Sequence, residues 1–255
     1  MIKYTMYGLM AMYALVFTLF IIYPFIDIHL WLYGIVFGWF FHWIVGSIII
    51  HRYITHRAFK VNKILHNIFI LLSTLVYAGS SLAWASTHRL HHVSSDTKKD
   101  PHSSTSYNWW QLLGLILVLT KDLENRKLEL LNCKDLLKDK MHLICHKYYI
   151  HINIAFILIL GLINVDWLIV FWIGIAYHMI GVLLFETIMY HNKLPFQYKN
   201  HDLDDNSYNN LYSTLFFHGE AYHNNHHKNP SSISNTEKWY EFDLNNIVIN
   251  LIKCK

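Results

Sequence analysis

The sequence predicts an all-α membrane protein with four transmembrane helices, additional interfacial or re-entrant helices, and a cytoplasmic helical cap. Apolar residues make up 54% of the 255-residue chain and charged residues only 15%, which is unlike a soluble domain. Long uncharged runs recur along the chain, and the basic residues are confined to the segments between some of them. We therefore expect a single membrane domain over residues 1–255.

Four apolar runs are long enough, or nearly so, to cross a bilayer, which takes about 20 residues. The third run is shorter and less apolar than the others. The first follows a single lysine and has no small-residue cleavage site after it, so we expect it to be retained and not removed as a signal peptide. The expected spans are residues 4–23, 30–50, 149–163 and 167–190.

The placement of charge predicts the orientation of these spans. The connections at 24–29 and 164–166 contain no Lys or Arg, so all 21 basic residues lie on the other side. By the positive-inside rule, both termini and a cap formed by 51–148 and 191–255 face the cytoplasm. The net charge of +4 then marks a surface near anionic lipid, and no nucleic-acid-binding motif occurs. A multi-pass protein of a bacterial inner membrane or the endoplasmic reticulum fits this pattern.

Histidines gather in three clusters, each just beyond an apolar run. Two clusters share the spacing His-x-x-His-His, which places three imidazoles on one face of a helical turn. The first cluster has a spacing of five, which separates its rings by about 140° on an α-helix, so a helix end or bend is needed there. Imidazole is the commonest metal ligand, so such clusters indicate metal binding. The clusters are His51 and His56; His88, His91 and His92; and His223, His226 and His227.

Two further apolar segments are expected not to cross the membrane. Residues 64–85 carry no charge and are long enough to span. Crossing here would put the first and second histidine clusters on opposite faces, whereas ligands of one metal centre lie only about 2 Å from the ion. We therefore expect a re-entrant or interface-lying helix. Residues 109–120 are too few to span and are expected to form another interfacial or buried helix.

The clusters predict a pair of metal ions. One zinc ion is satisfied by four ligands and favours some cysteine, whereas this chain offers eight clustered histidines and no paired cysteines. Neutral imidazole suits iron, so two iron ions are expected. Asp96 and Asp100 follow the second cluster and are expected to accept the free N–H groups of ligating histidines. The alternative for these two residues is a helix end followed by a solvated acidic loop.

The motifs around the clusters have a family resemblance. His-Arg-x-x-Thr-His-Arg, His-Arg-x-His-His-x-x-x-Asp-x-x-x-Asp-Pro-His and Gly-Glu-x-x-His-Asn-x-His-His occur in this order. They resemble the motifs of the integral-membrane fatty acid desaturases, specifically the acyl-CoA (delta-9, stearoyl-CoA-like) branch. The resemblance covers most of the chain, as far as Trp239–Asp243. It implies a ninth histidine ligand at the cytoplasmic end of the last span, a position that falls on His191.

The resemblance also implies how the ligands divide between two iron ions. One set is His51, His56, His88, His92 and His226, and the other is His91, His191, His223 and His227 with a water. Three positions depart from the family pattern: Thr187 stands for an asparagine expected to contact that water, Ala221 for a common glycine and Asn225 for a common aromatic residue. Trp84 matches an aromatic position and is expected to line the acyl tunnel or to be an ordinary interface tryptophan.

By resemblance, the chain is expected to be an O₂-dependent desaturase that introduces a double bond into a saturated acyl chain. An unactivated methylene has no acidic proton, so its hydrogens are removed by an oxidant that two ferrous ions generate from O₂. The substrate is expected to be an acyl-CoA held in a bent apolar tunnel. No cytochrome or GxGxxG motif occurs, so a separate electron donor of the ferredoxin or cytochrome b5 type is expected.

Other functions remain open at this point. A hydroxylase or ketolase on the same scaffold would use the same irons and differ in whether oxygen is transferred to carbon, which the product mass distinguishes. A non-catalytic membrane metal- or haem-binding protein is a second alternative, although haem carriers pair histidines inside spans and these clusters lie at the cytoplasmic ends. The acyl carrier is open between coenzyme A, a carrier protein and a glycerolipid.

Overall fold

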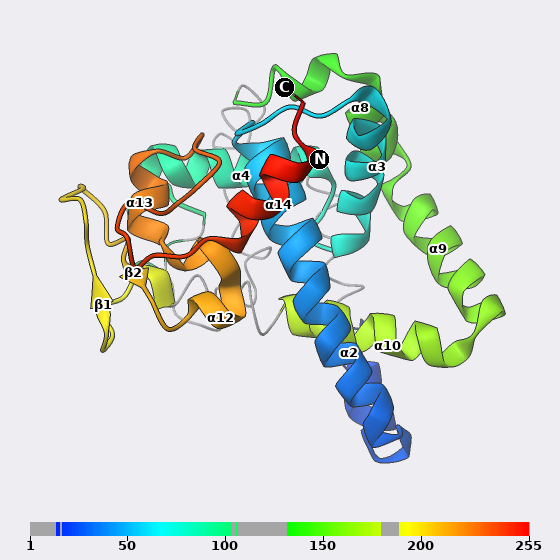
Figure 1. The fold of residues 1–255 in the computed structure, drawn as a ribbon. Coiled ribbons are helices and arrows are strands. Elements are labelled where there is room, and N and C mark those ends of the chain that lie inside the picture. Colours follow the sequence, from blue (N-terminus) through cyan, green and yellow to red (C-terminus); the bar gives the residue numbers. More distant parts are fainter. Residues whose placement is uncertain are drawn as a thin grey trace.

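Helices form nearly all of the regular structure (Figure 1). Strands β1 (Gln197–Tyr198) and β2 (Asn209–Asn210) pair antiparallel beside the helix that carries the third histidine cluster. The computed structural model describes residues 14–15, 17–101, 103, 106, 132–179 and 189–254. The helices of this part of the chain are η1 (Tyr23–Phe25), α2 (Ile28–Phe41), η2 (His42–Thr55), α3 (Lys63–Ser73), η3 (Thr74–Val76), α4 (Ser81–Ser94), η4 (Leu136–Lys138), α8 (Lys140–Lys147), α9 (Tyr149–Ile163), α10 (Val165–Ala176), α12 (Thr214–Phe217), η6 (His218–Ala221), α13 (His223–Lys228) and α14 (Leu244–Ile252).

The segments α2 and η2 form one continuous helix that contains the expected span 30–50. Asp27 caps its start by accepting a hydrogen bond from the backbone N–H of His29 at 2.7 Å. Among the described residues, it is the one helix that is long and apolar enough to cross a membrane by itself. Its outward-facing side chains are apolar, as a helix in contact with lipid requires. The exposed apolar residues of α2 include Leu32, Tyr33, Ile35, Val36 and Phe40.

Two pairs of helices are bent, and each is long and apolar enough to cross a membrane only if the pair acts as one span. The helices α3 and α4 meet at 80°, and α8 and α9 meet at 71°. The shorter apolar helix that begins as α10 continues to Met179. Of the expected segments, 4–23 and 167–190 lie partly outside the described residues and 109–120 lies wholly outside them. Within the described residues, one helix is therefore long and apolar enough to span a membrane, and there are up to three such segments if each bent pair acts as one span.

The chain bends by 80° between α3 and α4. Tyr77 (φ 63°) and Gly79 (φ 91°) adopt left-handed backbone conformations at the bend, which turns the chain back. Asn153 on α9 donates a hydrogen bond to the carbonyl oxygen of Thr74 at 3.0 Å, which fixes this turn. The chain then returns so that His88 lies beside the end of η2.

Helix α10 crosses α2 at a contact built from glycines. A Cβ atom on Gly34 would lie 2.5 Å from the side chain of Ile173, and one on Gly38 would lie 2.8 Å from the carbonyl oxygen of Gly174. Gly34 and Gly38 are four residues apart, the small-residue spacing that lets helices approach closely in membranes. The two helices therefore pack so closely that backbone atoms of α2 lie next to backbone atoms of α10.

We expect Gly38→Ala to lower the thermal unfolding midpoint, because the added methyl group meets backbone atoms that cannot move aside. Overpacking of this kind typically costs about 1–3 kcal/mol. Gly161→Ala is the matched control, since a Cβ there would approach only Leu168 Cδ2, at 3.3 Å. Thermal unfolding of both variants in detergent measures the difference, and equal midpoints would contradict the proposed crossing.

Helix α8 packs against the start of α4 through two polar contacts, one buried and one partly buried. Ser81 Oγ lies 2.7 Å from His142 Nδ1, and Ser80 Oγ lies 2.6 Å from His146 Nδ1. Burial lowers the pKa of His142 and of His146 to about 4. Both imidazoles are consequently neutral at pH 7, and the hydroxyl groups satisfy their buried nitrogen atoms.

We expect His142 to make the fold acid-sensitive between pH 6.5 and 4. In this window the unfolded chain binds a proton that the folded chain does not, so stability falls as pH falls. The loss from pH 7 to pH 5 is on the order of 2 kcal/mol for this group. His142→Gln should flatten the dependence of the unfolding midpoint on pH, whereas His151→Gln, at an exposed position, should not. An unchanged slope in His142→Gln would refute this assignment.

Candidate metal centre

The first histidine cluster is shaped by a π-helix. In η2 each backbone N–H bonds to the carbonyl five residues earlier, as from His56 to His51 at 3.1 Å. A spacing of five is then close to one turn, so the two rings lie 4.8 Å apart between centroids. The sequence requires a helix end or a bend at this point. The structure meets this requirement with a π-helix that ends at Thr55.

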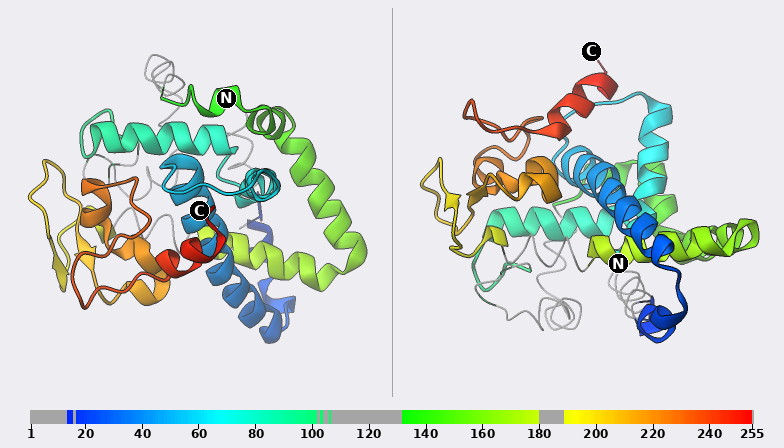
Figure 2. Two further views of the ribbon diagram at one scale, coloured as in Figure 1. Left: turned by 45° about the horizontal axis from the view of Figure 1, so that its top comes forward. Right: turned by 60° about the horizontal axis from the view of Figure 1, so that its bottom comes forward.

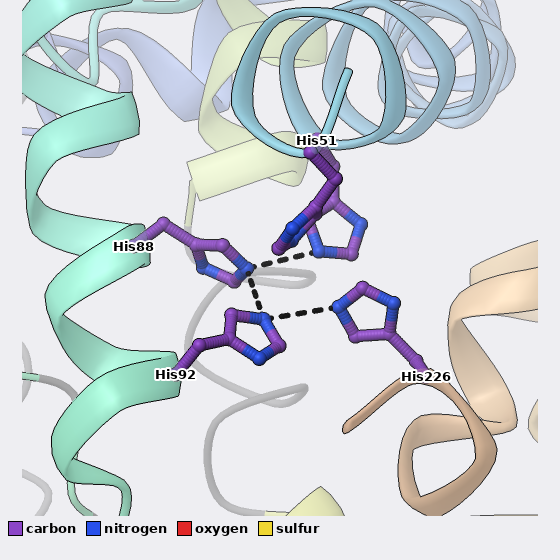
Figure 3. Close-up of side chains that lie close together, drawn as sticks. His51, His88, His92 and His226 are labelled. Atoms are coloured by element: carbon purple, nitrogen blue, oxygen red, sulfur yellow. Dashed lines mark hydrogen bonds between the residues drawn. The ribbon is translucent and has the colours of Figure 1, made fainter. Parts of the chain in front are cut away.

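Five histidines converge between η2, α4 and α13, and four of them are labelled in Figure 3. His88 Nε2 lies 2.9 Å from His51 Nε2 and 3.1 Å from His92 Nε2. His92 Nε2 is in turn 3.1 Å from His226 Nε2. Every member has a nitrogen atom within 4.8 Å of those of the others. This first set is His51, His56, His88, His92 and His226.

Four more histidines form a second set directly beside the first. His191 Nε2 lies 3.0 Å from His223 Nε2. The sets adjoin because consecutive residues of α4 and of α13 belong to different sets, and the ring centroids of His92 and His227 are 4.5 Å apart. The second set is His91, His191, His223 and His227. The structure therefore gathers the same two sets that the family resemblance implies.

The distances between ring nitrogens match those of ligands around a single ion. Two ligands with metal–nitrogen bonds of about 2.1 Å lie about 3.0 Å apart when they meet at a right angle. The closest nitrogen pairs in the two sets are 2.9–3.1 Å apart. His56 Nε2 and His227 Nε2 are buried and have no hydrogen-bond partner among the described residues, so bound ions would satisfy them. The residues present fit two metal ions.

Burial keeps the imidazoles of the third cluster, His223, His226 and His227, in the neutral form that binds metal. It lowers the pKa of His223 and of His226 well below the ordinary value, and the neighbouring histidines lower it further. Burial likewise lowers the pKa of His227 to about 4, although Asp205 acts in the opposite direction. A metal ion therefore does not have to displace protons from these rings at pH 7.

Carboxylates contact the outer nitrogen atoms of four histidines. Such contacts fix the tautomer, so that Nε2 carries the lone pair and points at the ion. The pairs are His91 Nδ1 with Asp100 Oδ1 at 2.9 Å, His191 Nδ1 with Asp96 Oδ2 at 3.2 Å, His227 Nδ1 with Asp205 Oδ2 at 2.8 Å, and His51 Nδ1 with Glu220 Oε2 at 2.6 Å. The sequence predicts Asp96 and Asp100 for this role. It does not predict Asp205, which has no characteristic spacing to a histidine, or Glu220, although Glu220 lies inside the third motif.

Glu220 links the first cluster to the third. Besides His51 it accepts hydrogen bonds from Arg52 Nε at 3.0 Å and from the hydroxyl group of Ser47. Arg52 is fully buried and also pairs with Asp243 at 3.2 Å. Burial alone would raise the pKa of the Glu220 carboxyl, but the neighbouring His51 and Arg52 hold it well below its usual range. Glu220 is therefore ionised at pH 7, and its second oxygen lies 2.6 Å from His51 Nδ1.

Asn225 takes the place of the family's aromatic residue and forms a buried polar hub in α13. Its side-chain oxygen accepts hydrogen bonds from Asn200 at 2.9 Å and from Asn209 in β2 at 2.8 Å. Its amide group donates to the carbonyl oxygen of Asn235 at 2.8 Å and to Glu241 at 3.0 Å. These bonds hold the third cluster to β2 and to the C-terminal segment.

The remaining predicted residues lie as follows. The indole ring of Trp84 stacks on His88, with centroids 6.0 Å apart and planes at 9°. Ala221 is buried in η6. Thr187 lies outside the described residues.

Together these features define a largely helical protein that gathers nine histidines into two adjacent sets, each of which could hold a metal ion. A family model described as fatty acid desaturase matches residues 27–243. The chain belongs to the fatty acid desaturase family, whose members are oxidoreductases associated with membranes.

Individual relatives agree with this family. The chain is 31% identical over 216 residues to the sn-1 stearoyl-lipid 9-desaturase of Anabaena variabilis. This alignment covers 83% of this chain and 78% of that protein. It is 33% identical over 205 residues to the protein of the same name from Synechocystis, and 29% identical over 210 residues to the icosanoyl-CoA 5-desaturase of Limnanthes douglasii. These matches cover 79% and 80% of this chain but only 62% and 56% of those two proteins.

Proposed function

We propose that this chain is an O₂-dependent fatty acyl desaturase that holds two iron ions in its two histidine sets. The observation that carries the proposal is the pair of adjacent sets, of five and four histidines, with nitrogen atoms within reach of one ion each. Imidazole ligands without thiolates favour iron over structural zinc. Bound iron would supply the oxidant, made from O₂, that removes hydrogen from an unactivated methylene.

The protein's own residues would position this chemistry. All nine histidines would serve as ligands, and Asp96, Asp100, Asp205 and Glu220 would orient them through their outer nitrogen atoms. Trp84, stacked on His88, would form part of the wall against which the acyl chain lies. Electrons would come from a separate ferredoxin or cytochrome b5-type protein.

We propose a four-span topology with both termini on the cytoplasmic side. The spans would be residues 4–23, the helix α2–η2, α9, and the helix that begins as α10. The 2.9 Å contact between His51 and His88 supports a re-entrant path through α3 and α4, because the chain between these residues must return to the same face. The histidine sets would then lie at the cytoplasmic ends of the spans, in either a bacterial inner membrane or the endoplasmic reticulum.

For the substrate we propose a saturated acyl chain that is desaturated at position 9. The names of the relatives from Anabaena variabilis and Synechocystis specify position 9 of a stearoyl-lipid, and that of the Limnanthes relative specifies an icosanoyl-CoA. The motifs favour acyl-CoA as the carrier, whereas the two cyanobacterial names favour a lipid-linked chain. Both carriers belong in the test.

The test is a product analysis with both carriers. Purified, iron-loaded protein in vesicles would receive stearoyl-CoA or stearoyl-phosphatidylcholine together with O₂ and a reduced ferredoxin. Gas chromatography–mass spectrometry with localisation of the double bond should show a monounsaturated acid with the bond at carbon 9 from one carrier. A product that gains an oxygen atom would instead indicate a hydroxylase or ketolase. Loaded, reduced protein that yields neither product would refute the proposal.

A further inference from the structure

An uncharged segment with exposed apolar side chains leads into the third histidine cluster. Residues 206–219 contain no Asp, Glu, Lys or Arg. Within this segment Leu215 is 76% exposed, Tyr212 66% and Phe216 57%. Clustered exposure of large apolar side chains marks a surface that contacts a partner.

A hydrogen bond places this segment beside the membrane-spanning helix. The indole N–H of Trp39 on α2 donates to the carbonyl oxygen of Leu215 at 3.1 Å. The distance from Ile28, at the start of α2, to Trp39 is about 16 Å along the helix, whereas the hydrocarbon layer is about 30 Å thick. Phe40, which contacts Trp39 edge-on, is 49% exposed on the apolar outer side of the same helix. Helix α12 thus lies next to α2, about 16 Å from the start of that helix (Figures 1 and 2).

The backbone of the segment is suited to a medium without water. The N–H groups of Tyr212 and Ser213 both bond to Asn210 Oδ1 at 3.1 Å. Those of Phe216 and Phe217 bond to the carbonyl oxygen of Ser213, at 3.0 and 2.9 Å. Hydrocarbon tolerates a backbone only where its polar groups are paired in this way. The paired N–H groups of these residues therefore meet a requirement that contact with lipid imposes on this segment.

We propose that residues 212–217 dip from the cap into the bilayer, where Leu215 and Phe216 contact the acyl chains of membrane lipids. Phe196, also exposed, packs edge-on against Tyr212 at 5.5 Å and extends the same surface. Aromatic side chains of this kind concentrate where membrane proteins meet the lipid headgroups. The inserted segment would anchor η6 and α13, and with them the third histidine cluster, at the membrane surface. This inference rests on the spanning helix and does not require the proposed activity.

The test measures the depth of a fluorophore at position 215. Leu215→Cys is made in a Cys254→Ser background, which removes the exposed cysteine and leaves Cys133 and Cys145 buried. The full-length protein is labelled with an environment-sensitive probe and reconstituted into phosphatidylcholine vesicles. Asp204→Cys, at an exposed position of the same cap, is the matched control. Phe216→Cys serves as a second position in case the first variant does not fold.

We expect probes at 215 and 216 to show blue-shifted emission and to be quenched several-fold more than the probe at 204 by lipids that carry a doxyl group on the acyl chain. The probe at 204 should instead be quenched by aqueous iodide. Equal quenching by the doxyl lipid at all three positions, or strong iodide quenching at both 215 and 216, would overturn the proposal. Neither result depends on whether the protein desaturates an acyl chain.

Discussion

Replacing His92 with alanine is expected to abolish product formation and to leave the chain inserted in the membrane. His92 Nε2 lies 3.1 Å from both His88 Nε2 and His226 Nε2, so it joins the ligands of α4 to those of α13. Without it the first set keeps four members and lacks its central ligand, while the second set is complete. Iron content should fall toward one ion per chain, and unsaturated product should disappear.

The matched control for this change is His151→Ala. His151 is exposed on α9, a helix that carries no member of either set, so its loss should leave iron content and turnover unchanged. Metal analysis and product analysis of both variants, purified side by side, make the comparison. Normal turnover in His92→Ala would show that this residue is not a ligand.

Glu220→Gln is expected to lower activity and iron affinity about 10- to 100-fold, the usual cost of losing a partner that orients a ligand. Glutamine keeps the size of the side chain but removes the negative charge that His51 Nδ1 contacts at 2.6 Å. Arg52, which is fully buried, would keep only Asp243 as a counter-charge. The unfolding midpoint should therefore fall as well, because an incompletely paired buried charge is destabilising.

Glu237→Gln provides the comparison for Glu220→Gln. Glu237 also pairs with a histidine, His201, at 2.7 Å, but this pair lies at the surface and outside both sets. Exposed pairs contribute little to stability, so the variant should resemble the wild type. Iron titration and turnover measured on both variants distinguish the two positions. A loss of equal size in both would contradict the role assigned to Glu220.

The histidine sets could be anticipated from the sequence because their signal is local. His-x-x-His-His specifies one face of a helical turn whatever the rest of the fold does, and α4 and α13 present their histidines in this way. His191 has no such neighbours, and only the family resemblance singled it out. The structure brings His191 Nε2 to within 3.0 Å of His223 Nε2.

Features that depend on tertiary structure were not visible in the sequence. The α-helical period sets His51 and His56 far apart around a helix, and only the π-helical hydrogen bonds of η2 bring them together. Asp205 lies 22 residues before His227 and meets it because the chain folds back through β1 and β2. Hydropathy likewise indicates which segments are apolar, but the 80° bend between α3 and α4 depends on the packing around it.

The most direct test of the account is the metal content of the purified protein. The protein would be purified from an iron-supplemented host and loaded anaerobically with ferrous iron. Its iron content would then be measured by elemental mass spectrometry, in parallel with that of the His92→Ala variant. The account predicts two iron ions per chain in the wild type and a fall toward one in the variant. Wild-type protein that holds no iron, or the same iron content in both proteins, would contradict the assignment of the two histidine sets.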